Sequence, residues 1–155
     1  MRVRFKLLHE DAKLPAYATA GASGFDLVAI EDVEIEPGET LLVKTGLSVE
    51  IPEGYEMQVR PRSGLSLKTP LRVANSPGTV DSDYRGEVCV IMNNSADPRY
   101  VPVGDLAFRN KAQTIKKGDR IAQGVICPVI RADLVIVTEH TDTVRGAGGF
   151  GSTGK

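Results

Sequence analysis

The sequence predicts an all-β protein, because its dominant hydrophobic period is two residues and turn residues separate its short apolar segments. At 155 residues the chain is long enough to form one domain around a single core. Many short strands at this spacing are typical of a β-sandwich, a jelly roll or a barrel.

Strand signals run along most of the chain. Val3, Phe5 and Leu7 alternate with basic residues, as a half-buried strand requires. Shorter alternating segments lie at 33–35, 47–51 and 57–59. Apolar runs that are rich in β-branched residues, typical of buried strands, lie at 88–92, 121–130 and 134–137. Pro and Gly turn signals separate them at 37–38, 52–54, 77–78 and 117–119.

One short helix is predicted across Ser63 to Lys68, because Pro61 precedes it and Pro70 ends it. The last residues, 145–155, contain five glycines and one apolar side chain, Phe150. Such a composition cannot hold itself on a core, so we expect a domain over 1–144 followed by a mobile tail.

Charge and cysteine content narrow the function classes. The net charge of −1 gives no reason to expect a nucleic-acid or membrane surface, so a polyanionic ligand would need locally gathered positive charge. Cys89 and Cys127 both lie in apolar runs and are expected to be reduced core thiols. The N-terminus shows no apolar signal segment and the chain has no transmembrane run, which favours an intracellular, cytoplasmic protein.

Three segments contain residues that could bind a ligand or take part in catalysis. Arg60–Gly64 places two arginines and a hydroxyl at the start of the predicted helix. This arrangement is either a phosphate-binding site or an exposed basic turn, and the pentapeptide alone favours neither. Asn75–Gly86 contains Asp81 and Asp83, which are either ordinary turn residues or carboxylates able to orient a water. The tail is either a frayed terminus or a glycine-rich arm that closes over an anion.

Taken together and in order, these segments resemble the five sequence motifs of the dUTPase family. The five matching segments cover almost the whole chain and are 22–27, 61–65, 78–87, 118–123 and 145–154. Five ordered matches are far more specific than any one of them.

The resemblance implies a fold and an activity. The expected fold is a jelly-roll-like, distorted β-barrel that assembles as a homotrimer with active sites shared between subunits. The expected reaction is hydrolysis of dUTP to dUMP and pyrophosphate, which limits uracil incorporation into DNA and supplies dUMP for dTMP synthesis.

The same resemblance assigns roles to residues. Asp81 would be the general base, and Tyr84 would lie against the deoxyribose and exclude a 2′-OH. Asn75 and the backbone around Thr79, Val80 and Cys89 would bind the uracil edge. The residues expected to hold the phosphates or close over the nucleotide are Arg62, Ser63, Gly64, Gln123, Arg145, Phe150, Gly151, Ser152 and Thr153. Asp26 would reach Mg²⁺ through water, with the ion carried by the triphosphate.

Two rival functions and one departure accompany this prediction. In the related dCTP deaminases the catalytic glutamate would fall at Ile91, and an aliphatic side chain cannot transfer protons. A regulatory nucleotide-binding module without turnover is the other rival, although Asp81 and the tail are both present. The stretch from Asn93 to Lys116 is longer than the resemblance leads us to expect and is interpreted as an insertion.

Overall fold

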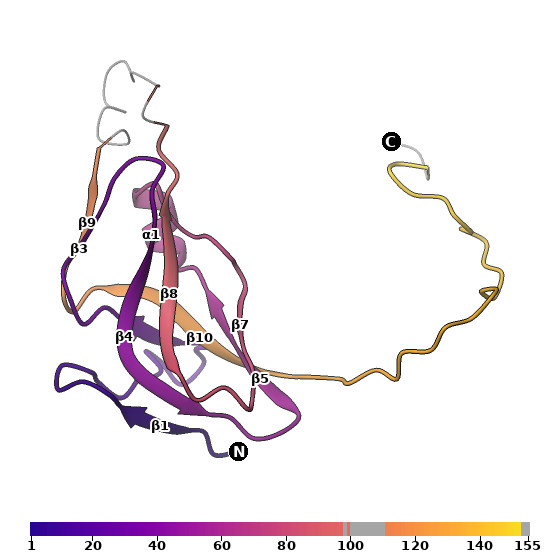
Figure 1. Cartoon of the computed structure of the whole chain (residues 1–155), viewed down its shortest axis with the longest axis horizontal. Helices are drawn as coiled ribbons and strands as arrows, with labels where there is room; N and C mark the ends of the chain where they lie inside the picture. The colour runs from indigo at the N-terminus through magenta and orange to yellow at the C-terminus, as the bar shows by residue number, and fades with distance from the viewer. Residues whose placement is uncertain (98, 100–110, 153–155) are drawn as a thin grey trace.

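Two four-stranded antiparallel sheets form the body of the computed structural model, which describes residues 1–97, 99 and 111–152 (Figure 1). One sheet has the order β1-β4-β8-β6 and the other β2-β10-β5-β7, while β3 and β9 form a separate pair. The strands of the first sheet are β1 Arg4–Leu7, β4 Thr40–Glu50, β8 Glu87–Asn94 and β6 Leu71–Val73. The others are β2 Phe25–Val28, β10 Arg120–Pro128, β5 Tyr55–Arg60, β7 Gly78–Val80, β3 Val33–Ile35 and β9 Gln113–Ile115.

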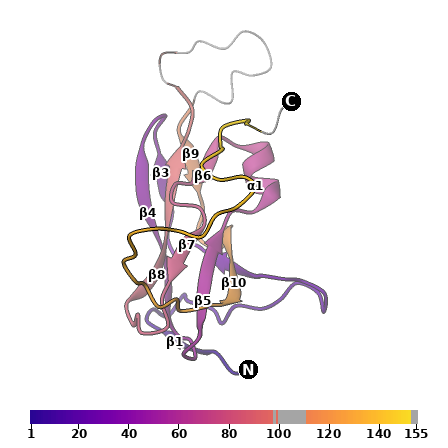
Figure 2. The same ribbon diagram turned by 90° about the vertical axis from the view of Figure 1, so that its right-hand side faces the viewer.

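The all-β prediction is confirmed for the described residues, where α1 (Ser63–Lys68) is the one helix and has the predicted bounds. It packs beside β6 (Figure 2). The described strands do not close into a barrel; they remain in the separate sheets given above.

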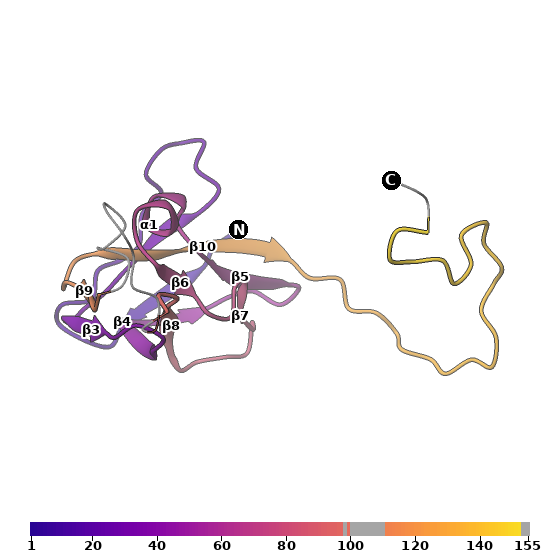
Figure 3. The same cartoon turned by 90° about the horizontal axis from the view of Figure 1, so that it is seen from above.

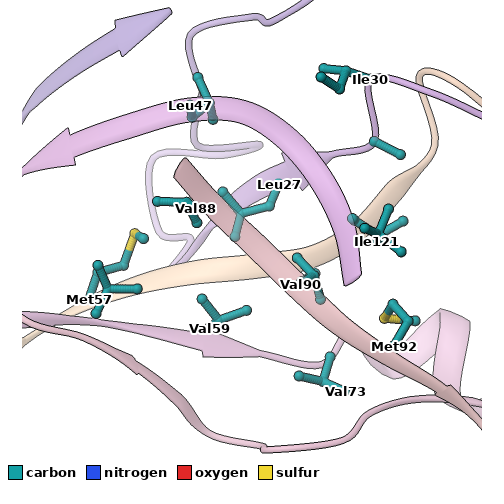
Figure 4. Packing of buried hydrophobic residues seen from close by; sticks show 14 of the residues in the cluster. Leu27, Ile30, Leu47, Met57, Val59, Val73, Val88, Val90, Met92 and Ile121 are labelled. Carbon is teal, nitrogen blue, oxygen red and sulfur yellow. The ribbon is translucent and has the colours of Figure 1, made fainter. Parts of the chain in front are cut away.

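The hydrophobic core lies between the two large sheets, which turn buried apolar side chains toward each other. Val88 and Val90 of β8 point toward Met57 and Val59 of β5 (Figure 4). Leu27 of β2 lies in the same cluster and is fully buried.

A bulge in β4 lets this long strand pair on both of its edges. β4 pairs with β8 up to Lys44, the register shifts, and pairing resumes at Leu47, which also begins the pairing with β1. Gly46 sits in the bulge with a positive φ of 66°, and a Cβ there would lie 2.8 Å from the Cβ of Ala12. Only glycine meets both conditions without strain.

The strand prediction at the C-terminal end is wrong in two places. β10 ends at Pro128, so Val129 and Ile130 lie outside it, and residues 134–137 form no strand. From Ile130 to Ser152 the chain leaves the body as an extended arm (Figures 1 and 3). Ile136 is fully exposed. An apolar run predicts a strand only where a neighbouring strand supplies hydrogen-bond partners, and this arm has none beside it within the described chain.

Other predictions need smaller corrections. The strand predicted at 2–7 exists as β1 but begins only at Arg4, and Leu7 is half exposed because β1 is an edge strand of its sheet. The expected insertion at 93–116 begins with the last residues of β8 and ends with β9, and most of the intervening stretch (98 and 100–110) lies outside the described residues.

Candidate functional site

A pocket of about 470 Å³ opens between strands of both large sheets. This is the size range of small-molecule sites in proteins, roughly 300–1,000 Å³. It brings together six residues that the sequence singled out, which are Asn75, Thr79, Val80, Asp81, Tyr84 and Cys89. The pocket therefore gathers the residues assigned to base, sugar and water, which come from two loops and two strands.

One wall of the pocket is the face of β8 that points away from the core. Burial alternates strictly along β8, so Val88 and Val90 are buried while Cys89 and Ile91 are only half-buried. The cross-strand partners of Cys89 and Ile91 on β4 are Lys44 and Leu42, and all four residues line the pocket. A single strand thus supplies both the core and the pocket wall.

The predicted position of the two cysteines is only partly correct. Both are free thiols, but neither is fully buried. Burial, and next the negative charge of Glu87, raise the pKa of the Cys89 thiol to about 11, so this thiol is neutral at physiological pH. Cys89 therefore contributes an uncharged, weakly polar surface to the pocket rather than a nucleophile.

Asn75 precedes β7, Asp81 follows it, and both residues line the pocket. A Cβ at Gly78 would lie 3.0 Å from Nδ2 of Asn75, so the glycine allows the amide to approach the strand closely. Asp81 follows β7 directly and its carbonyl accepts a hydrogen bond from the backbone N–H of Tyr84 at 3.2 Å. Asp81 is thus both a turn residue and a pocket residue, so the two interpretations of its role are compatible.

Tyr84 is fixed at the pocket by two contacts. Its hydroxyl donates to the carbonyl of Glu87 at 3.0 Å. Its ring lies over Gly86, where an added Cβ would clash with the hydroxyl oxygen and lie 2.5 Å from Cζ. The ring could not keep this place if residue 86 had any side chain.

A second cluster lies at one end of the β2-β10-β5-β7 sheet. It contains three of the predicted residues, which are Asp26, Arg62 and Gln123. Arg62 Nε is 2.9 Å from Oδ1 of Asp26, and Nη1 of Arg62 donates to the carbonyl of Arg120 at 3.0 Å. The amide of Gln123 donates to the carbonyl of Pro61 at 2.9 Å. Strand pairing explains the convergence, since Gln123 lies opposite Asp26 on β2 and opposite Arg60 on β5.

The pocket and this arginine cluster lie at different places in one chain. Val80 pairs with Met57, so Asp81 is level with Glu56, whereas the cluster begins beyond Arg60. Four residues of β5 separate these levels, which is roughly 13 Å at about 3.3 Å per residue. Among the described residues lining the pocket, none belongs to the arginine cluster.

The remaining predicted residues are exposed. Ser63 and Gly64 form the first turn of α1 beside Arg62. Phe150 is fully exposed, Gly151 has a positive φ of 93°, and Ser152 donates through its backbone to Gly149. The Arg145 side chain donates to the carbonyl of Gly148 within the same turn, at 2.7 Å. Thr153 lies outside the described residues. Within the described chain, residues 145–152 thus contribute to neither the pocket nor the arginine cluster.

Several pocket and cluster residues were missed by sequence reasoning. Lys44, Leu42 and Glu87 line the pocket, and no local motif marks the first two, because they reach it only through pairing of β4 with β8. Arg120 could have been found: it lies three residues before Gln123 in the fourth motif segment, and its guanidinium is 3.1 Å from Asp26.

The described residues offer no dedicated metal cage. Nowhere in 1–97, 99 or 111–152 do three or more His, Cys, Asp or Glu side chains gather as metal ligands. In the same part of the chain, no helix has the length and apolar character needed to cross a membrane.

Comparison with known proteins decides the family. The dUTPase family model matches residues 10–154. The chain belongs to the dUTPase family. The deoxyuridine 5′-triphosphate nucleotidohydrolase of Nautilia profundicola is 52% identical over 155 residues and is covered completely, as is this chain. The enzyme of the same name from Hydrogenobaculum sp. is 51% identical over 155 residues, with 99% of each chain covered.

Solved dUTPase structures share the fold. The dUTPase of Staphylococcus bacteriophage 80alpha with dUpNHpp is 31% identical, with a TM-score of 0.87 over 99% of both chains. A mutant dUTPase from phage phi11 of S. aureus, described with a structural Mg(II) ion, is 30% identical, with a TM-score of 0.78 over 90% of this chain and 98% of that one. Membership of the dUTPase family therefore rests on sequence and fold together.

Proposed function

We propose that this dUTPase-family chain hydrolyses dUTP at the α-phosphorus to dUMP and pyrophosphate. The observation that carries the proposal is the pocket of nucleoside size with Asp81 and Tyr84 in its wall, in a chain 52% identical over its full length to a named dUTP nucleotidohydrolase. Its cellular role is then to limit uracil incorporation into DNA and to supply dUMP for dTMP synthesis.

The pocket chemistry suits a deoxyuridine. The Asn75 amide and the main chain of Thr79, Val80 and Cys89 provide donors and acceptors for the uracil edge. A narrow slot of this kind discriminates by leaving the wrong partner's polar groups unpaired. Tyr84 lies where a sugar would follow the base and leaves no space for a 2′-OH.

The triphosphate requires positive charge and N–H donors. Arg62, Ser63, Gly64 and Gln123 provide them at the end of β5 and the start of α1. The tail adds Arg145, Ser152 and Thr153 for phosphate oxygens, glycine N–H groups such as that of Gly151, and Phe150 to stack on the base. Withdrawal of charge from the α-phosphorus lets a water attack, and Asp81 accepts the proton of that water.

Magnesium fits this set of residues as an ion carried by the substrate. The Asp26 carboxylate lies beside Arg62, but both of its oxygens already contact guanidinium groups. A triphosphate-bound Mg²⁺ that keeps several waters needs few protein ligands, so Asp26 would reach it through water. When bound, the ion neutralises phosphate charge in the transition state.

A homotrimer with shared sites joins the parts that one chain keeps separate. Asp81 and the Arg62 cluster lie at levels of β5 that are roughly 13 Å apart, and the arm exposes Ile130, Leu134 and Ile136 almost fully. Apolar surface of this kind is normally covered by a partner. Arms from neighbouring subunits would also complete the jelly-roll-like barrel that the separate sheets leave open.

A deaminase is the second candidate, and the structure offers an observation against it. Ile91 lines the pocket, so the position where the related deaminases carry a glutamate presents an aliphatic surface to the ligand. The first experiment is a pyrophosphatase-coupled phosphate-release assay with dUTP, dCTP and UTP, in which we expect only dUTP to be consumed. Ammonia release from dCTP would instead favour the deaminase, and binding without turnover a regulatory module.

The cellular setting follows from the substrate. Two free thiols and a nucleotide substrate fit the reducing cytoplasm. With a net charge of −1, nucleic acid and membrane surfaces are not among the partners that we propose.

Replacing Asp81 should separate turnover from binding. Asp81→Asn keeps the size of the side chain but removes the charge that accepts a proton, so kcat should fall roughly 10²–10⁴-fold while dUpNHpp still binds. Steady-state kinetics and calorimetry on the same preparation measure both. Asp83→Asn, in the same turn, is the matched control and should retain turnover. Parallel loss of binding and turnover in Asp81→Asn would identify Asp81 as a structural turn residue.

Tyr84 and the glycine beneath it should control the choice of sugar. Wild type should ignore UTP, and Tyr84→Ala should raise the UTP/dUTP ratio of kcat/KM. Gly86→Ala should raise it too, because its Cβ would displace the Tyr84 ring. Gly21→Ala is the control, since its Cβ would meet nothing within 4 Å. An unchanged ratio in folded Tyr84→Ala protein would remove the ring from sugar discrimination.

Subunit mixing tests whether the sites are shared. Arg62→Ala and Asp81→Asn homotrimers should each be nearly inactive. Refolding them together should restore activity, since some sites then combine an intact Arg62 from one chain with an intact Asp81 from another. Native mass spectrometry verifies that mixed trimers form. Mixed trimers no more active than their parents would place both residues in the site of one chain.

The tail should act on turnover and not on stability. We propose that residues 145–155 order over the bound triphosphate, where Phe150 and Arg145 gain partners that offset an ordering cost of roughly 1–2 kcal/mol per residue. Truncation after Val144 should leave the oligomer and its Tm nearly unchanged but greatly lower kcat/KM for dUTP. If the truncated protein unfolds, the tail is needed for the stability of the domain. If the truncated protein keeps full turnover, the tail does not close over the substrate.

A further inference from the structure

The carboxylate of Asp26 is shared between Arg62, which directly precedes α1, and Arg120, the first residue of β10. Oδ1 contacts Nε of Arg62 at 2.9 Å and Oδ2 contacts Nη1 of Arg120 at 3.1 Å. The Asp26 and Arg62 side chains are only 23% and 27% exposed, whereas that of Arg120 is 56% exposed. Partial burial makes these ion pairs more rigid and less screened than ordinary surface pairs.

Arg62 is held on two sides of its guanidinium fork. Its Nε contacts Asp26, and its Nη1 donates to the carbonyl of Arg120 at 3.0 Å. The planar fork has five N–H donors, and these two contacts use only the one on Nε and one on Nη1. A guanidinium fixed in this way is pre-organised for a phosphate oxygen before any nucleotide arrives.

A strand irregularity brings Arg120 to the same place. The register between β10 and β2 shifts between Arg120 and Ala122, and Ile121 and Ala122 are consecutively buried. The bulge lets Arg120 and Gln123, three residues apart, both face the Asp26 cluster instead of opposite faces of the sheet. Arg120 therefore presents a second, more exposed guanidinium beside Arg62.

We propose that Asp26 is a positioning residue that clamps Arg62 and Arg120 into a two-arginine receptor for the triphosphate, and that Arg120 is a further phosphate-binding residue. The inference rests on the proposed function and deepens it. It gives Asp26 a role that requires no metal ion, separate from any contact with magnesium through water.

The substitution Asp26→Asn breaks this clamp with little change in shape. The new side chain still has one oxygen to accept from Arg62, but its NH₂ group would face the donor Nη1 of Arg120, and neither of these groups can accept. The loss of charge and of one acceptor should free both arginines.

The test is binding of dUpNHpp by calorimetry, in Mg²⁺ and again in EDTA. Asp26→Asn and Arg120→Gln should each weaken binding about tenfold or more, which is roughly 1.4 kcal/mol, and by a similar factor in both buffers. Arg120→Lys should recover part of the loss, because it restores the charge without the fork. Asp32→Asn, which removes a surface carboxylate paired with Lys116, is the control and should bind like wild type.

Each alternative gives a different result. Weakening of Asp26→Asn only in Mg²⁺ would overturn the inference and leave Asp26 as a magnesium residue. Unchanged binding in folded Asp26→Asn and Arg120→Gln proteins would overturn it as well, with the proposed function intact. Wild-type protein that neither binds dUpNHpp nor hydrolyses dUTP would overturn the proposed function itself. Since Arg120 is exposed, its variants remain informative even if Asp26→Asn fails to fold.

Discussion

β10 hydrogen-bonds to β2 along one edge and to β5 along the other, and the arginine cluster depends on this double pairing. The register sets Gln123 between Asp26 and Arg60, so that residues far apart in the sequence meet at one end of the sheet. Close packing supports the arrangement, since a Cβ at Gly124 would clash with the Phe25 ring and lie 2.7 Å from its Cζ. A change in β10 register by one residue would turn Gln123 to the opposite face and dissolve the cluster.

The pocket depends on a second strand with two functional faces. β8 buries Val88, Val90 and Met92 in the core, whereas its residues Cys89 and Ile91 line the pocket. The position of the pocket wall is therefore fixed by core packing, which tolerates little displacement. This coupling explains how a loop-borne residue such as Asp81 can face a rigid surface: β7, directly before it, is hydrogen-bonded to β5 of the same core.

Two features of the single chain would both be explained by its association with identical chains. Its nucleoside pocket and its arginine cluster lie apart, and its arm leaves apolar side chains such as Ile130 and Ile136 in water. Association of identical chains would bury the arm and bring clusters from different subunits together. Under the proposed function, assembly would be a condition of catalysis and not only of stability.

The sequence by itself determined the β class, the bounds of the one described helix and six of the residues that line the pocket, because period-two patterning, proline punctuation and ordered motifs are local properties of a chain. Sequence patterns did not predict the features that depend on which strands pair with each other. The run at 134–137 has strand composition but no partner strand within the described chain, and Cys89 was expected in the core but lies on the outer face of β8. Only the tertiary structure placed Lys44 and Leu42 in the pocket and Arg120 against Asp26, because register, bulges and cross-strand neighbours bring together residues that no local pattern connects.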